Sequence, residues 1–334
     1  MIAAPNQARW VRPEPRRTMP AKLLERIVHV VFPHASILNI QTFTDGLRNA
    51  NFRLELDSGQ QVVLRIYEHD PSLCQKEVDL VRLIGDSVPV PEVLYAEPRG
   101  WEDTPPFTLA RYIEGITFRE LKRNGDAVAI AQASYSAGQV LASIARTTFS
   151  KPGWLASGSN VNRTLLDGPN PVPRFVDLCL ASANLQGRME ADLRDRTHEL
   201  VWSWAPQIAS LDNESRLVHG DFGKRNLLVR RVAGKWMVVA VLDWEFAVSG
   251  ASLIDVGHFL RYERSLRPVV EPHFSAGYLT AGGSLPENWR QLARIFDIAA
   301  LSESLTHDHL PDTVASELVE LVHAIVQLLS HEPL

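Results

Sequence analysis

Residues 217–229 read LVHGDFGKRNLLV, and residues 238–246 read VVAVLDWEF. In both stretches an apolar run rich in β-branched residues lies beside polar or charged residues, and a turn around Gly234 separates the two runs. This pattern predicts a β-hairpin formed by Leu227–Val229 and Met237–Leu242. Because a hairpin brings its two open ends together, the polar residues at those ends should converge on one small volume.

Polar side chains with oxygen ligands stand at the open ends of this hairpin. Asp221 and Asn226 precede the first strand, and Asp243 ends the second. Carboxylate and amide oxygens suit Mg²⁺, and a carboxylate beside the metal can act as a base. Taken singly, His219 and the two Asp residues are also compatible with turn caps. Their combination favours a metal-dependent active site.

The order of these residues resembles that of a known group of enzymes. The sequence H-G-D-x-x-x-x-N over residues 219–226, followed by a strand that ends in Asp243, resembles the catalytic and metal-binding loops of the aminoglycoside phosphotransferase and choline kinase-like family. Protein kinases carry the related H-R-D-x-x-x-x-N and D-F-G sequences. Here Gly220 replaces the Arg, and Asp-Trp-Glu stands in place of D-F-G. The resemblance extends over about residues 37–309.

The resemblance implies an α+β, bilobal protein-kinase-like fold. The N-lobe, residues 21–113, should hold an antiparallel sheet with a helix, and the larger C-lobe, residues 114–334, should be mainly helical. Residues 1–20 are rich in Pro and Arg, lack the apolar stretch of a signal peptide, and are expected to form an extended arm. A helical insert at about 151–210 should help to shape the acceptor pocket. Within it, residues 151–173 are rich in Gly, Ser, Asn and Pro, which predicts loop.

The hydrophobic periodicity agrees with this division. The segments with β-branched or alternating patterns, which predict strands, are 37–43, 52–56, 61–67 and 106–113. Apolar residues at helical spacing occur mainly in 21–32, 72–84, 126–148, 174–209 and 272–334.

The turn of residues 44–51 is a candidate phosphate-binding loop. A Gly with short polar residues lets backbone amides approach an anion, although the same residues are ordinary in hairpin turns. The turn resembles the G-x-x-N-x-x-Φ variant of the family, in which Φ is aromatic. In this chain those positions are Gly46, Asn49 and Phe52.

Arg65 lies in the middle of a strand, where a charge without a partner is costly. It resembles the strand lysine that holds the α- and β-phosphates in kinases, and Arg keeps that chemistry because its guanidinium is a permanent bidentate donor. We expect Glu77, in the helix of residues 72–84, to pair with it; an exposed Arg and a solvated Glu are the alternative. At the hinge of the family, the backbone at Arg111 and Ile113 is expected to bind the base.

The resemblance implies transfer of the γ-phosphoryl group of ATP or GTP to a hydroxyl group of a small molecule. Asp221 would take the hydroxyl proton, and His219 would brace its loop. Asn226 and Asp243 would hold Mg²⁺. Asp255 corresponds to a family acid that braces the catalytic loop, and a helix cap is the alternative. The rival functions are a primary-metabolite kinase acting on choline, a sugar or an amino alcohol, and an inactive nucleotide-binding regulator.

The charge distribution bears on the acceptor. Residues 251–334 hold 11 Asp and Glu against 5 Arg and no Lys, whereas the whole chain has a net charge of only −5. An acidic region attracts cations, so a cationic, aminoglycoside-like antibiotic is the first expectation; solvated helix faces are the alternative. The acids expected to face the acceptor are Glu263, Glu271, Asp297 and Glu303.

The composition restricts the class of protein. A chain of 334 residues with 45% hydrophobic content can bury a large core. No apolar run approaches the roughly 18 residues of a membrane helix, and no basic stripe alternates with aromatic residues, so neither a membrane nor nucleic acid is an expected partner. Cys74 and Cys179 have no metal or disulfide spacing, which indicates a reducing cytoplasm.

Overall fold

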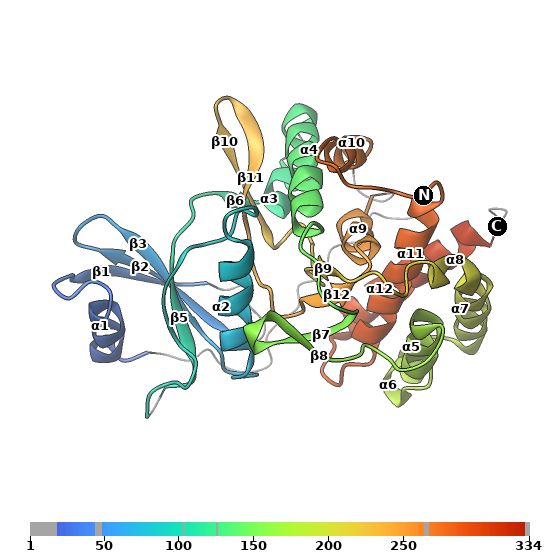
Figure 1. The fold of residues 1–334 in the computed structure, drawn as a ribbon, viewed down its shortest axis with the longest axis horizontal. Coiled ribbons are helices and arrows are strands. Elements are labelled where there is room, and N and C mark those ends of the chain that lie inside the picture. Colours follow the sequence, from blue (N-terminus) through green and yellow to red (C-terminus); the bar gives the residue numbers. More distant parts are fainter. Residues whose placement is uncertain (1–18, 44–48, 103, 125, 264–266, 331–334) are drawn as a thin grey trace.

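The computed structural model describes residues 19–43, 49–102, 104–124, 126–263 and 267–330. Figure 1 shows an antiparallel sheet on one side of the molecule and most of the helices on the other, which is the two-lobed arrangement predicted from the sequence. The elements up to the connection between the lobes are α1 (Ala21–His29), β1 (Ile37–Thr42), β2 (Ala50–Leu56), β3 (Gln61–Ile66), α2 (Leu73–Ile84), β4 (Val93–Glu97) and β5 (Phe107–Arg111).

The N-terminal sheet has the strand order β1-β2-β3-β5-β4, and each neighbouring pair is antiparallel. Buried and half-buried residues alternate along β2 and β3, so one face of the sheet packs against α1 and forms a small core. Leu64 faces that core, and the alternation therefore places Arg65 on the opposite face. Arg65 pairs with Asn51 on β2 and Thr108 on β5, in the middle of the sheet.

Helix α2 belongs to both lobes. Its chain position is in the N-terminal part, but Leu80 and Ile84 pack in the large hydrophobic core that the C-terminal helices form. Figure 1 shows α2 between the sheet and the C-terminal part of the molecule. Polar residues on α2 are therefore able to reach both lobes.

The rest of the chain builds the larger lobe around that core. Its elements are β6 (Ile116–Thr117), α3 (Phe118–Arg123), α4 (Ala127–Ile144), β7 (Gly153–Ala156), the 3₁₀ turn η1 (Ser157–Ser159), β8 (Asn160–Arg163), α5 (Pro171–Leu180), α6 (Ala183–Arg188), α7 (Ala191–Ser203), α8 (Ala205–Ala209), β9 (Arg216–Val218), β10 (Leu227–Val232), β11 (Lys235–Val241), β12 (Val248–Gly250), α9 (Leu253–Leu260), α10 (His273–Thr280), α11 (Trp289–Leu305) and α12 (Asp312–Leu329).

One local prediction is wrong. Residues 151–173 were expected to be loop inside a helical insert, but they contain the hairpin β7–β8. Strand β7 pairs with β12, and β12 pairs with β9, so the four strands form one sheet in the order β8-β7-β12-β9. The partners are distant in sequence, which is why local composition gave no sign of them. The remainder of the insert is helical, as expected.

Two other predictions concern the ends of the chain and membranes. The predicted extended arm, residues 1–20, lies almost entirely outside the described residues. Within the described ranges, every helix is too short or too polar to cross a membrane.

Candidate active site

The predicted hairpin is present as β10 and β11. The two strands are antiparallel, with Leu227 opposite Val241, and the turn at Ala233 and Gly234 has positive φ at both residues. At the open end, the Leu242 amide donates to the Asn226 carbonyl over 2.8 Å. The loop before β10 and the loop after β11 therefore lie side by side, as the sequence predicted.

Asp221 and Asn226 are in direct contact in the first of these loops. Asn226 Nδ2 donates to Asp221 Oδ2 over 2.8 Å and to the Asp221 carbonyl over 3.0 Å. Burial raises the pKa of Asp221 to about 6, and the negative charge of Asp243 adds to this effect while Arg261 opposes it. A carboxylate that ionises near neutral pH is suited to accept a proton from a substrate.

His219 connects the two loops. Its Nε2 lies 2.9 Å from the Leu242 carbonyl, and its Nδ1 accepts the Asp221 amide hydrogen over 3.2 Å. These partners call for a neutral ring with the proton on Nε2. Burial lowers the pKa of His219 to about 4, which keeps the ring neutral at physiological pH.

Asp255, in the first turn of α9, binds the backbone of the catalytic loop. Its carboxylate accepts the amide hydrogens of His219 over 2.7 Å and Gly220 over 2.9 Å, so it braces that loop. Gly220 has φ +80°, and a Cβ built there would collide with the Phe246 carbonyl. The Arg that protein kinases carry at this position therefore does not fit.

Arg65 is surrounded by carboxylates from both lobes. Its Nη2 lies 3.1 Å from Glu77 Oε1, which is the predicted pair, and 2.6 Å from Asp243 Oδ1. A third carboxylate oxygen, Glu245 Oε2, is 3.6 Å away. Burial alone would lower the pKa of Arg65, but the charges of Asp243 and Glu77 outweigh it and raise that pKa well above its usual value.

Sequence reasoning did not single out Glu245 and Lys76. Asn49 Nδ2 donates to Glu245 Oε2 over 3.2 Å, and Lys76 Nζ donates to the Glu245 carbonyl over 2.8 Å. Lys76 is buried beside Glu77, and burial lowers its pKa. The sequence sign of a role for Lys76 is that it adjoins Glu77, the predicted partner of Arg65. Because a lysine on a helix is usually solvated, that sign is weak.

The donor set fits Mg²⁺. Glu77, Asp243 and Glu245 each offer an oxygen, and these oxygens lie within 4.8 Å of one another. Asn49 Oδ1 is buried without a hydrogen-bond partner among the described residues. The amide nitrogen of Asn226 is bonded to Asp221, so its amide oxygen is the atom suited to a metal. Carboxylate and amide oxygens are the ligands that Mg²⁺ prefers.

The structure describes only some of the residues that the sequence predicted to contact the nucleotide. Gly46 lies outside the described residues, whereas Asn49 is buried. The Arg111 amide donates to the Glu92 carbonyl inside the sheet, and the Arg111 side chain pairs with Glu92 over 2.9 Å. The Arg111 amide is therefore engaged inside the sheet, and the predicted contact between the base and the backbone at Arg111 stays a prediction. The contact predicted at Ile113 stays a prediction.

The four acids predicted to face the acceptor are all bonded inside the protein. Glu263 accepts the amides of Val270 and Glu271, over 2.8 and 2.9 Å. Glu271 accepts the Ser275 amide at the start of α10 and pairs with Arg290 over 3.1 Å. The acid excess in residues 251–334 is thus partly used to hold backbone and side chains of the lobe.

The other two acids follow the same pattern. Asp297 is 2% exposed and binds Arg261 through both carboxylate oxygens, the shortest distance being 2.7 Å. Glu303 Oε1 lies 2.8 Å from His307 Nε2, one turn later. For Asp297 the predicted acceptor contact is wrong, because a buried counter-ion of Arg261 is not accessible to a ligand.

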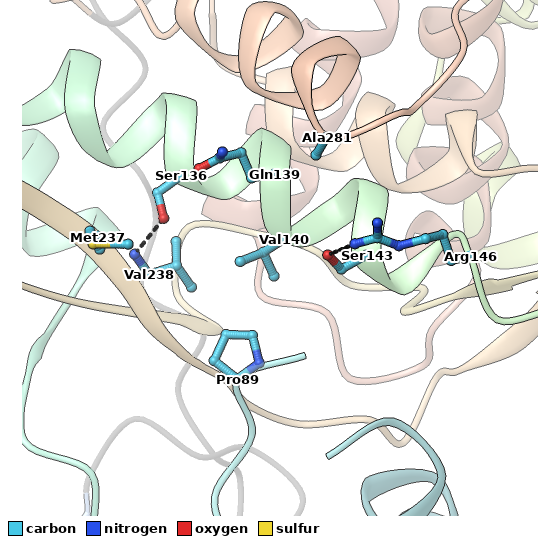
Figure 2. A pocket seen from close by; sticks show the side chains of 9 residues that line it. All are labelled: Pro89, Ser136, Gln139, Val140, Ser143, Arg146, Met237, Val238 and Ala281. Atoms are coloured by element: carbon cyan, nitrogen blue, oxygen red, sulfur yellow. Dashed lines mark hydrogen bonds between the residues drawn. The ribbon is translucent and has the colours of Figure 1, made fainter. Parts of the chain in front are cut away.

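A separate hollow of about 400 Å³ lies between α4 and β11. Figure 2 shows its lining side chains, among them Ser136, whose hydroxyl accepts the Val238 amide hydrogen over 3.0 Å. The lining residues are Pro89, Ser136, Gln139, Val140, Ser143, Arg146, Met237, Val238 and Ala281. This set includes none of the predicted site residues, so the chemistry of the loops lies elsewhere.

The comparison with family models decides the assignment. The model described as "Phosphotransferase enzyme family" matches residues 39–295, which is more than half of the chain. The chain belongs to the phosphotransferase enzyme family. The resemblance noted in the sequence is thereby confirmed.

Solved structures show which fold this phosphotransferase has. Aminoglycoside phosphotransferase APH(4)-Ia, in a ternary complex with AMP-PNP and hygromycin B, is 19% identical, with a TM-score of 0.65 over 93% of this chain and 99% of that one. The GDP complex of an aminoglycoside 2'-phosphotransferase-IIIa mutant is 16% identical, with a TM-score of 0.66 over 92% and 97%. These likenesses confirm the bilobal, kinase-like fold.

A curated relative is larger than this phosphotransferase. Acyl-CoA dehydrogenase family member 11 of Gallus gallus is 26% identical over 235 residues, which make up 68% of this chain. The same residues make up 28% of the relative, so the likeness concerns just over a quarter of its length.

Proposed function

We propose that this phosphotransferase moves the γ-phosphoryl group of ATP or GTP to a hydroxyl group of a small molecule, with Mg²⁺ as cofactor. The observation that carries the proposal is the pair of contacts Asn226–Asp221 and Arg65–Asp243 at the open end of one hairpin. Together they bring a base, two oxygen ligands and a phosphate-binding cation to one place. Complexes of solved relatives with AMP-PNP, ADP and GDP support a nucleotide as donor.

In the proposed reaction, Asp221 orients the acceptor hydroxyl and takes its proton. The acceptor oxygen forms a bond to the γ-phosphorus while the bond between that phosphorus and the β–γ bridging oxygen breaks, and the nucleoside diphosphate leaves. Asn226 and Asp243 would hold Mg²⁺, which when bound would supply positive charge to neutralise the phosphate oxygens. Loose transition states of this kind need mainly positioning and charge neutralisation, which the residues of this site supply.

The N-lobe residues bind the donor in this proposal. Arg65 binds the α- and β-phosphates, and Glu77 holds the guanidinium in place. Asn49 and Gly46 belong to the loop that covers the phosphates, and the backbone at Ile113 binds the base. His219 holds Asp221 in a fixed position relative to the loop that follows β11.

The acceptor is the finer part of the proposal. An aminoglycoside-like antibiotic is one candidate, because the solved relative bound hygromycin B. The acidic excess that first favoured such a cation gives little support, since the acids predicted to bind it have partners inside the lobe. The two buried free cysteines support a cytoplasmic setting.

Nucleotide consumption across a panel of acceptors tests the proposal. The purified chain is incubated with MgATP or MgGTP and with aminoglycosides, choline, sugars, amino alcohols or hydroxy acids, and phosphorylated products are identified by mass spectrometry. We expect one class of acceptor to be phosphorylated, and the Asp221→Asn variant to lose this activity while still binding nucleotide. Tight nucleotide binding without transfer to any acceptor would favour the rival, an inactive regulator.

A further inference from the structure

Glu245 is a buried carboxylate to which the proposed reaction gives no task. It stands at the third position of Asp243-Trp244-Glu245, where the protein-kinase sequence D-F-G has a glycine. Its exposed fraction is 7%, and a buried charge is costly unless hydrogen bonds and ion pairs compensate for it. The groups that contact Glu245 therefore indicate what this residue does.

Three segments of the N-lobe contact Glu245. Asn49, directly before β2, donates from Nδ2 to Glu245 Oε2 over 3.2 Å. The same carboxylate oxygen lies 3.6 Å from Nη2 of Arg65 on β3. Lys76, on α2, donates from Nζ to the backbone carbonyl of Glu245 over 2.8 Å. One residue of the loop after β11 thus joins two strands and the helix of the N-lobe to the C-lobe.

The contact with Glu245 also decides how the side chain of Asn49 is oriented. An ionised carboxylate can only accept hydrogen bonds, so the NH₂ group of Asn49 must face it. The amide oxygen of Asn49 is then buried without a hydrogen-bond partner among the described residues, although the residue is only 6% exposed. Because a buried acceptor without a partner is costly, the contact with Glu245 is what holds Asn49 in this position.

This contact lies at the phosphate end of the proposed nucleotide site. Arg65, 3.6 Å from Glu245, is also 2.6 Å from Asp243 and 3.1 Å from Glu77. In the proposed function the nucleotide binds between the N-lobe sheet and the loop that carries Asp243. A contact that joins the start of β2 to this loop keeps the two walls of the site at a fixed separation. A site arranged in advance loses less conformational entropy when its ligand binds.

We propose that Glu245 is a positioning residue for the nucleotide. Its carboxylate holds Asn49 and so keeps the N-lobe sheet in place over Asp243 before the nucleotide binds. This inference rests on the nucleotide-binding part of the function proposed above. A neutral amide suits the task, because it binds the carboxylate without neutralising it and leaves the negative charge available to Arg65.

The test exchanges the two partners and measures the affinity for a fluorescent ADP analogue, with and without Mg²⁺. Asn49→Asp sets two buried carboxylates against each other and should weaken binding by about 10- to 100-fold. Adding Glu245→Gln restores one amide and one carboxylate with their roles exchanged. The double variant should therefore regain about tenfold in affinity, because the second change rescues the first.

Alanine variants remove the contact without adding a charge, and they decide the matter if Asn49→Asp does not fold. Asn49→Ala should weaken nucleotide binding by about 3- to 10-fold. Asn49→Ala combined with Glu245→Ala should bind no more weakly than the weaker single variant, since both changes remove one contact. Asn39→Asp, at an exposed position of β1, adds the same charge to the same sheet and is the control that should change nothing. Melting temperatures show that the variants fold.

Additive effects of the two changes would show that Asn49 and Glu245 act independently, and would overturn the inference. An effect of Glu245→Ala that disappears without Mg²⁺ would show that Glu245 is a metal ligand instead, which also overturns it. Either result together with normal transfer to an acceptor leaves the proposed function standing. Coupled effects on nucleotide affinity without transfer to any acceptor would support the inference and remove the proposed function. A wild-type chain that binds no nucleotide would overturn both.

Discussion

Lys76 Nζ, on α2, donates a 2.8 Å hydrogen bond to the backbone oxygen of Glu245, two residues after Asp243. This bond ties the helix that also carries Glu77 to the loop expected to hold Mg²⁺. Replacing the lysine removes this donor from a buried carbonyl, and the loss of such a hydrogen bond costs about 1–3 kcal/mol. The consequence should appear in nucleotide binding, because the loop bears Asp243.

We therefore expect Lys76→Met to raise the KM of MgATP by about tenfold, the equivalent of roughly 1.4 kcal/mol, with a smaller change in the KM of the acceptor. Steady-state kinetics with each substrate varied in turn give the two values. Lys76→Arg, which can still donate to the Glu245 carbonyl, should recover part of the affinity. Equal effects on both KM values would show that Lys76 serves only general stability.

Asp221→Asn preserves the shape of the side chain but removes the proton acceptor. We expect kcat to fall by about 10²–10⁴-fold while the affinity for nucleotide barely changes. Fluorescence titration with a nucleotide analogue provides the binding measurement, and product formation provides the rate. Near-normal turnover in this variant would exclude Asp221 as the base.

The pH dependence of the rate follows from the pKa of Asp221, which burial raises to about 6. The base acts in its ionised form, so kcat/KM should be constant above neutrality and fall by about tenfold per unit below pH 6.

The free energy of unfolding should depend on pH in the opposite direction. Since the folded-state pKa lies above the unfolded value, ionisation costs stability as the pH rises through about 6.

Asp221→Asn should accordingly melt at a higher temperature than the wild type at pH 8, and this advantage should shrink at pH 4. Differential scanning calorimetry at the two pH values measures it. A pH–rate profile that is flat down to pH 5 would contradict the raised pKa.

Asp243→Asn removes a ligand charge and one partner of Arg65. We expect the Mg²⁺ concentration for half-maximal activity to rise by at least about tenfold, because Mg²⁺ binds a neutral amide more weakly than a carboxylate. Titration of Mg²⁺ at saturating ATP measures this. Asp86→Asn, an exposed change next to α2, is the matched control. An unchanged requirement would show that the metal lies elsewhere.

Arg65→Ala removes the cation that lies among Glu77, Asp243 and Glu245. The KM of ATP should rise more than the KM of the acceptor, because the guanidinium is expected to bind the α- and β-phosphates. Three close carboxylates without their common counter-ion should also lower the melting temperature. Arg82→Ala, at an exposed position of α2, should change neither value. A larger effect on the acceptor KM would contradict the assignment.

The sequence by itself determined the features that depend on residues close together along the chain. The spacing from His219 to Asn226 and the apolar runs around Gly234 predicted the hairpin and the meeting of its open ends, because register and strand pairing within a hairpin follow from neighbouring residues. The charge of Arg65 in mid-strand likewise predicted a buried partner, and the partner is Glu77, only 12 residues away.

Only the tertiary structure decided the contacts between distant segments. Arg65 and Asp243 are 178 residues apart, and Lys76 and Glu245 are 169 apart. The hairpin β7–β8 depends on β12. A count of charges predicted an acidic surface, yet the partners of Glu263 and Asp297 are set by how α9, α11 and the loop before α10 pack together. The physical reason is that a charged side chain takes its role from the groups that surround it after folding, and packing selects those groups over the whole chain.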